Sequence, residues 1–224
     1  MRDELTHAIE DYLKTIYDLS LRHGRASTTK IAEELDVAPA SVTGMIKRLA
    51  TTTPPLVEYE KHRGVTLTSD GEKVALEIIR HHRLIELFLQ ETLGYSWDEV
   101  DAEADRLEHV VSSKFGERIA EVLGDPTHDP HGDPIPTREL KIPTYATLCL
   151  SHLREQERGT IQRVRDTDPN LLRYLSERGI MPQATFTVMA YAPFDGNLTL
   201  QVDQQDELVV LGPRITEQIF VEQE

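Results

Sequence analysis

The sequence predicts a mainly α-helical protein with small β parts, divided into three segments. Apolar residues recur at helical spacing over most of the first 123 residues. Five proline residues then lie between Gly124 and Pro143, which excludes regular structure there. Beyond about residue 159, short runs alternate apolar and polar residues as strands do. We therefore expect segments 1–75, 76–143 and 144–224, the second of them ending in the proline-rich linker.

The composition is that of an ordinary globular protein, with 39% apolar and 28% charged residues among 224. The single cysteine, Cys149, excludes an internal disulfide and a zinc-thiolate pattern. No run approaches the roughly 18 apolar residues of a membrane span, and the first twenty residues lack the apolar centre of a signal peptide. We expect a cytoplasmic protein with no membrane partner.

The net charge of -15 argues against nucleic-acid binding if it is taken alone. The acidic residues, however, are concentrated outside the first segment. Residues 1–75 hold ten of the 24 Lys and Arg residues and twelve of the 39 Asp and Glu residues, and are close to neutral. The first segment can therefore still contact phosphates.

The first 50 residues predict one helix followed by a helix-turn-helix. Residues 4–20 carry an apolar face, and Asp11 lies beside it, where it can point at a neighbouring helix. After the turn at His23-Gly24, short helices are expected over 30–35 and from 38 to about 50, joined by a tight turn. Small and hydroxyl residues open the second of these helices, as in a recognition helix.

Residues 56–60 and 65–68 predict two strands around a basic turn, which makes a wing. A helical hairpin with a solvated polar face is the alternative, but the order of helix-turn-helix and wing favours DNA binding. The expected contacts are small or hydroxyl side chains for base edges and basic side chains for phosphates. They are Thr29, Ala38, Pro39, Ser41, Thr43, Lys47, Arg48, Lys61 and Arg63.

Two long helices are expected next, over 69–93 and 96–123. His82 and Glu86 are four apart on the first helix, and Asp105, Glu108 and His109 share a face of the second at i, i+3 and i+4. Carboxylates and imidazoles without a thiolate suit Mn²⁺ or Fe²⁺. A Glu and His pair on a helix is more often plain surface, so the spacing alone does not establish a metal site.

The last segment predicts a small β-barrel with one helix. Strands are expected over 160–165, 185–191, 197–202, 207–211 and 218–221, with a turn at Asp195-Gly196 and a helix over 169–177. In the proline-rich linker before it, the acids and histidines between 128 and 133 are interpreted as turn formers.

Six segments, taken in order, resemble the diphtheria toxin repressor family of iron- and manganese-dependent regulators. They are EDYLKTIYDL, IAEELDVAPASVTGMIKRL, GVTLTSDGEKVA, RHHRLIELFL, EADRLEHVVS and DPHGDPIP. The likeness covers essentially the whole chain. It implies an N-terminal winged helix-turn-helix domain, a helical dimerisation domain that holds the metal, and a C-terminal SH3-like (FeoA-like) barrel. It also implies a homodimer that binds a palindromic double-stranded DNA operator when loaded with metal, and controls metal-uptake genes.

The resemblance also implies the metal ligands, carried over motif by motif. They are Asp11, His82, Glu86, Asp105, Glu108 and His109. An ancillary site would join His82 and Glu86 to Asp101 and to a residue of the C-terminal domain, for which Asp166 is the loose match. Without metal, the acids Asp11, Asp105 and Glu108 would repel one another and leave the first helix loosely held.

Departures from the family's pattern favour manganese. Iron-responsive members carry Met and Cys where this chain has Asp11 and Asp105, and hard carboxylates favour Mn²⁺ over softer ions. Fe²⁺ is the alternative cofactor, and Co²⁺, Ni²⁺ or Zn²⁺ are expected as surrogates in vitro. Manganese-responsive members without the third domain use a second acid where this chain has Lys14, which argues against a bridged pair of metals.

Two other classes of function stay open at this point. A helical metalloenzyme would need an open coordination position and a second matched pair of acid-and-histidine helices, which the sequence does not offer. A helix-turn-helix regulator of an organic ligand would bind DNA regardless of chelator. We therefore predict a Mn²⁺-responsive repressor that is not an enzyme and needs no small organic ligand.

Overall fold

The computed structural model describes residues 5–60, 62–165 and 168–224. The chain divides into two compact units. Unit 1 runs to His81 and also includes 108–110 and 138–141. Unit 2 consists of 82–107, 111–137 and 142–224. Lys61 and Asp166, both expected to be functional, lie outside the described residues.

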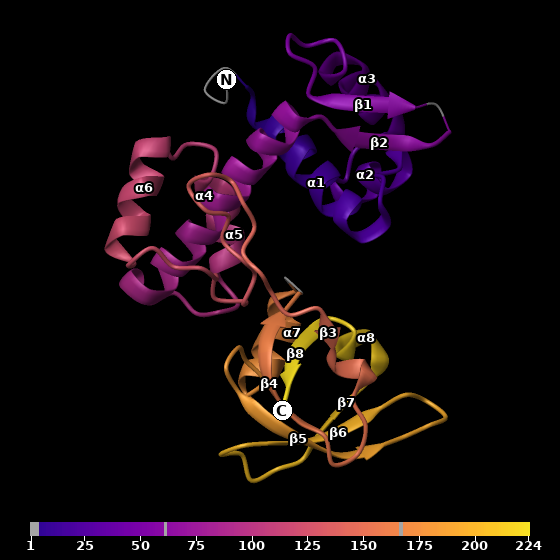
Figure 1. Ribbon diagram of the computed structural model, residues 1–224, viewed down its shortest axis with the longest axis vertical. Helices are drawn as coiled ribbons and strands as arrows, with labels where there is room; N and C mark the ends of the chain where they lie inside the picture. The colour runs from indigo at the N-terminus through magenta and orange to yellow at the C-terminus, as the bar shows by residue number, and fades with distance from the viewer. Residues whose placement is uncertain (1–4, 61, 166–167) are drawn as a thin grey trace. The chain divides into compact units, whose positions relative to one another are not determined.

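Unit 1 contains the predicted helix-turn-helix and wing (Figure 1). Ser27 accepts a hydrogen bond from the backbone of Lys30 and begins the second helix, and Pro39 stands in the first turn of the third. The two strands pair in antiparallel register from Val57 with Leu67 to Glu60 with Gly64. The elements are α1 (His7–His23), α2 (Thr28–Glu34), α3 (Pro39–Leu49), β1 (Val57–Glu60) and β2 (Gly64–Leu67).

The core of unit 1 joins α1 to the two helices of the helix-turn-helix. Leu13 and Ile16 of α1 are fully buried in the same cluster as Ile31 of α2 and Val42 and Ile46 of α3. Burying side chains of this size contributes roughly 1.5–3 kcal/mol each. A constraint on α1 is therefore a constraint on α2 and α3.

α4 (Ser69–Leu93) begins in unit 1 and forms one long helix, as expected. The expectation of a second long helix over 96–123 is wrong. α5 (Val100–Leu107) ends before Glu108, and α6 (Ser113–Val122) begins anew because the Ser112 side chain accepts from the backbone of Phe115. Glu108 and His109 therefore lie in a turn and do not extend the helical face of Asp105.

The proline-rich segment of unit 2 contains no helix or strand, but it is not an extended spacer. We call residues 127–135 the central loop. One carboxylate oxygen of Asp129 accepts from the backbone of His131 at 2.8 Å and of Asp133 at 2.9 Å, and Ile135 donates to the carbonyl of Thr127 at 2.8 Å. Ile135 is buried with side chains of α4, α5 and α6, so the loop belongs to the helical core.

The rest of unit 2 is an antiparallel sheet curled into a small barrel (Figure 1). Its strand order is β3-β8-β4-β5-β6-β7, and its core is a cluster of buried side chains that includes Ile161, Phe186 and Leu200. No helix among the described residues is long and apolar enough to cross a membrane. The elements are β3 (Leu148–Cys149), the short 3₁₀ helix Leu150–His152, β4 (Arg158–Val164), α7 (Pro169–Ser176), β5 (Thr185–Tyr191), β6 (Leu198–Val202), β7 (Val209–Leu211), α8 (Pro213–Thr216) and β8 (Ile219–Gln223).

Candidate metal centre and nucleic-acid interface

The predicted DNA contacts lie on α2, on α3 and at the wing. Most of the described ones are exposed, namely Thr29, Ala38, Pro39, Ser41, Lys47, Arg48 and Arg63. Thr43 is half-buried, and its hydroxyl donates to the carbonyl of Pro39 at 3.1 Å, so it is engaged within its own helix. Arg63 donates to Glu60 across the wing at 2.9 Å. Unit 1 thus presents a polar, partly basic helix together with a hairpin.

We call Asp11, Glu108 and His109 the first cluster. One ligand atom from each lies within 4.8 Å of the others, and all three residues belong to unit 1. Asp11 Oδ1 lies 2.9 Å from His109 Nε2, and Glu108 Oε1 lies 3.5 Å from the same nitrogen. The Glu108 side chain is only 1% exposed, whereas that of Asp11 is 43% exposed. The cluster therefore has one buried and one accessible carboxylate.

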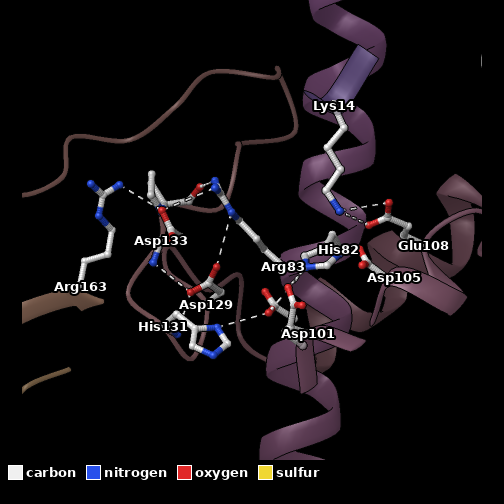
Figure 2. Close-up of polar contacts among 12 residues, drawn as sticks. Lys14, His82, Arg83, Asp101, Asp105, Glu108, Asp129, His131, Asp133 and Arg163 are labelled. Atoms are coloured by element: carbon white, nitrogen blue, oxygen red, sulfur yellow. Dashed lines mark hydrogen bonds and ion pairs between the residues drawn. The ribbon is translucent and has the colours of Figure 1, made fainter. Parts of the chain in front are cut away.

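Lys14 adds a positive charge to the first cluster. Its ammonium donates to both carboxylate oxygens of Glu108, at 3.2 and 2.9 Å (Figure 2). Lys14 lies one turn after Asp11 on α1, and a buried carboxylate needs such a compensating charge. The expected repulsion between Asp11 and Glu108 is consequently offset by Lys14 and by the imidazole of His109.

Glu10 is a buried acid of α1 that the sequence analysis missed. Its Oε2 lies 2.6 Å from His109 Nδ1, on the opposite side of the ring from Asp11. The hydrogen bond to Asp11, and then that to Glu10, raise the pKa of His109 to about 9 against the effect of burial. A signal for Glu10 was present in the sequence, since it follows Ile9 and precedes Leu13 by three positions beside the apolar face.

His82 is the centre of a second group of predicted ligands, all in unit 2. Its Nε2 lies 3.6 Å from Glu86 and 3.5 Å from Asp101, and its Nδ1 lies 3.4 Å from Asp105 (Figure 2). One ligand atom each of His82, Glu86 and Asp101 lies within 4.8 Å of the others. His82, Glu86 and Asp101, the described residues of the predicted ancillary site, thus lie together, and Asp105 extends this group from α5.

We call Glu86, Asp129 and His131 the second cluster. One ligand atom from each lies within 4.8 Å of the others, and all three side chains are buried. His131 Nδ1 lies 3.3 Å from Glu86 Oε1. The sequence analysis interpreted Asp129 and His131 as turn formers and placed no ligand there, because their contact with α4 depends on the folding of the central loop.

The charges of the second cluster are matched within it. Burial raises the pKa of Asp129 well above its ordinary value, and the charge of Glu86 adds to this effect. Burial also opposes the charged forms of Glu86 and His131. The charge of His82 and the contact with His131 nevertheless lower the pKa of Glu86. Glu86 in turn raises the pKa of His131 to about 9. Glu86 and His131 therefore form a buried ion pair, and Asp129 beside them is a weaker acid than usual.

Arginine and tryptophan side chains hold the second cluster in place. Arg83 donates to the carbonyl of Pro134 at 2.6 Å, and its Nε lies 3.5 Å from Asp129 (Figure 2). Trp97 donates its indole hydrogen to the carbonyl of Pro130 at 3.1 Å. Arg163 of β4 donates to Asp133 at 3.0 Å. The central loop therefore connects α4 to the barrel.

Both clusters fit a hard or borderline divalent ion. Their donor atoms are carboxylate oxygens and imidazole nitrogens, and neither includes a thiolate. A winged helix-turn-helix whose first helix supplies a ligand to such a cluster defines a class of protein, the DNA-binding regulators that respond to a metal.

Comparisons with known proteins identify the family. The chain matches the iron dependent repressor N-terminal DNA binding domain over 4–65, the iron dependent repressor metal binding and dimerisation domain over 68–137, and the FeoA domain over 148–223. The iron-dependent repressor IdeR of Mycobacterium tuberculosis (strain ATCC 25618 / H37Rv) is 31% identical over 206 residues, covering 83% of this chain and 85% of that protein.

Two further relatives are transcriptional regulators, and the description of the second names manganese. The HTH-type transcriptional regulator MntR of Oceanobacillus iheyensis is 36% identical over 118 residues, covering 53% of this chain and 78% of that protein. A solved structure described as a manganese-dependent transcriptional repressor in complex with manganese is 38% identical, with a TM-score of 0.86 over 96% of this chain and 100% of that one. The chain belongs to the iron-dependent repressor family, and is a metal-dependent transcriptional repressor of that family. The resemblance drawn from the six segments is confirmed.

Proposed function

We propose that this repressor responds to Mn²⁺ and, when loaded, binds an inverted-repeat operator as a homodimer to control metal-uptake genes. The observation that carries the proposal is the first cluster, in which Asp11 of α1 meets Glu108 and His109 with hard donor atoms only. α1 is also part of the core of the helix-turn-helix. Metal binding and the position of α3 are therefore linked through one helix.

The donor set supports manganese before iron. Carboxylates at Asp11 and Asp105 are harder ligands than sulfur, and Mn²⁺ prefers oxygen donors. A bound divalent ion would supply the positive charge that Lys14 and the His109 proton otherwise give to Glu108 and Asp11. The expectation is activation by Mn²⁺ at a lower free concentration than by Fe²⁺ under anaerobic conditions, and the opposite order would assign the protein to iron.

The magnitude of the coupling follows from linkage. If the metal favours the DNA-competent position of α1 by about 1–3 kcal/mol, operator affinity rises about 5- to 150-fold, and the operator tightens metal binding by the same factor. In a symmetric dimer the two copies of α3 would read half-sites about one DNA turn, roughly 34–36 Å, apart. The two-fold symmetry of such a dimer is why we expect an inverted repeat.

The ligand assignment includes an ancillary group in unit 2. Glu86 is common to the group with His82 and Asp101 and to the second cluster with Asp129 and His131. We assign Asp11, Glu108 and His109 to the metal that controls DNA binding, and the groups around Glu86 to an ancillary ion that supports unit 2. Asp105 and Asp166 stay candidate ligands.

The test uses Asp11→Ala and Glu108→Ala, with Glu91→Ala as a control that removes an exposed carboxylate of α4. In gel-shift titrations with Mn²⁺, only the two cluster variants are expected to lose the metal-dependent gain in operator affinity, which is about 5- to 150-fold. Thermal melts in chelator check that both variants fold. A variant that responds to Mn²⁺ as wild type does would contradict the assignment.

A further inference from the structure

Four residues on one face of α1 contact the first cluster. His7, Glu10, Asp11 and Lys14 are spaced i, i+3, i+4 and i+7, so they line one side of the helix. The ring of His7 stacks on that of His109, with centroids 4.8 Å apart and planes 15° apart. Lys14 binds Glu108, while Glu10 and Asp11 bind opposite edges of the His109 ring. α1 therefore fixes the orientation of this ring as well as supplying a ligand.

A neutral imidazole carries its proton on one nitrogen and offers a lone pair on the other. In His109, Nδ1 lies 2.6 Å from the Glu10 carboxylate, and Nε2 lies 2.9 Å from Asp11. A carboxylate without a hydrogen can only accept, so both contacts require a ring proton in the metal-free structure. A metal that binds Nε2 replaces the proton shared with Asp11, whereas the Nδ1 proton shared with Glu10 stays in place. Nε2 is then the nitrogen that faces Asp11 and Glu108.

We propose that Glu10 is a positioning residue, which holds the His109 proton on Nδ1 and so directs the Nε2 lone pair to the metal of the first cluster. The inference rests on the proposed function, because it assigns a role toward the same metal. Glu10 contacts no metal itself. It acts through the ring of His109.

The burial of Glu10 supports a specific role. Only 4% of its side chain is exposed, and a carboxylate removed from water to this extent costs free energy unless charged or donor groups compensate it. A short hydrogen bond from an imidazole is such a compensation. A helix that needed only solubility would place an acid on its exposed side.

Outer carboxylates of this kind raise the basicity of a ligating histidine and set its orientation, and losing one typically weakens metal binding 10- to 100-fold. Glu10→Ala is therefore expected to weaken Mn²⁺ binding by about that factor, with the number of ions per subunit unchanged. In Glu10→Gln the amide oxygen still accepts from Nδ1, so this variant should recover most of the loss. A charge effect alone would instead make the two variants equal.

The experiment combines calorimetric Mn²⁺ titrations of the full-length wild type, Glu10→Ala, Glu10→Gln and the control Glu91→Ala with ¹⁵N spectra of the Zn²⁺-loaded wild type. The spectra should place the remaining ring proton of His109 on Nδ1. A proton on Nε2, or wild-type affinity in Glu10→Ala, would overturn the inference.

The readouts also separate this inference from the proposed function. A wild type that binds no Mn²⁺ refutes the proposed function, whereas a wild type that binds Mn²⁺ beside an equally tight Glu10→Ala refutes the role of Glu10 alone. If Glu10→Ala fails to fold, the wild-type spectra still decide the tautomer.

Discussion

The first and second clusters use the same ligand types in opposite surroundings. The first is formed by α1 and the turn after α5, and one of its carboxylates, that of Asp11, is partly accessible to water. In the second, Glu86 of α4 and Asp129 and His131 of the central loop are all buried. An accessible ligand on a helix can respond to metal by a small movement, whereas a buried group must be taken out of its packing. The difference suits the first cluster to sensing and the second to support.

The two clusters also neutralise their acids differently. In the first, the ammonium of Lys14 contacts Glu108, and the Lys14 side chain is 22% exposed. In the second, Asp129, whose pKa is raised by burial, lies beside the Glu86 and His131 ion pair, and Arg83 Nε lies 3.5 Å from Asp129. A flexible cation can be displaced at small cost, but removing a buried partner leaves an uncompensated charge.

The largest expected effect tests whether the central loop, which carries the second cluster, is a rigid support. Gly132 has φ +83°, and a Cβ there would collide with the backbone of Gln162 and Arg163. Gly132→Ala should lower the free energy of unfolding by about 3 kcal/mol, because left-handed strain and overpacking add. Chemical denaturation in chelator measures it.

Gly124→Ala is the matched control. Gly124 also has positive φ, +77°, but its Cβ would meet nothing within 4 Å. It should cost only the strain of about 1–2 kcal/mol. Equal losses of unfolding free energy in the two variants would mean that the contact of the central loop with β4 does not stabilise the fold. The second cluster would then not be the rigid support that the comparison assumes.

A smaller effect tests whether Lys14 competes with metal at the first cluster. Because its ammonium must leave Glu108, Lys14→Gln should tighten Mn²⁺ binding about tenfold, the value of a modest charge-assisted hydrogen bond. Calorimetry measures it, and Lys73→Gln, which removes an exposed ammonium paired with Asp70, is the control. Weaker binding in Lys14→Gln would instead mean that Lys14 prepares Glu108 for the metal.

The parts of the fold and of the site that could be predicted from the sequence are those with local signals. The winged helix was predictable because Ser27 and Pro39 mark their helices locally and the apolar spacing marks the core. The break after Leu107 was missed because no Gly or Pro marks it and the cap at Ser112 depends on a hydroxyl that also occurs inside helices. The family resemblance supplied Asp11, Glu108 and His109.

The second cluster depends on contacts far apart in the sequence. Asp129 and His131 reach Glu86 because Trp97, Arg83 and the backbone of β4 hold the central loop. No local pattern in a proline-rich stretch encodes those contacts. The proximity of Asp129 and His131 to α4 was therefore beyond the reach of spacing arguments.

The smallest effect concerns pH. The pKa values of His109 and His131 are raised from an ordinary 6.5 to about 9, so their charged forms stabilise the metal-free fold fully below pH 6.5 and lose that effect as pH rises through 9. Unfolding free energy in chelator should thus fall between pH 6.5 and 9, by about 1 kcal/mol in all after allowance for solvent screening. His109→Gln should remove the pH-dependent stabilisation that comes from the first cluster and keep the stabilisation that comes from His131. If the pH dependence of the unfolding free energy is unchanged in this variant, Asp11 and Glu10 do not hold His109 in its charged form. The pH dependence would then come from the buried pair of Glu86 and His131 alone.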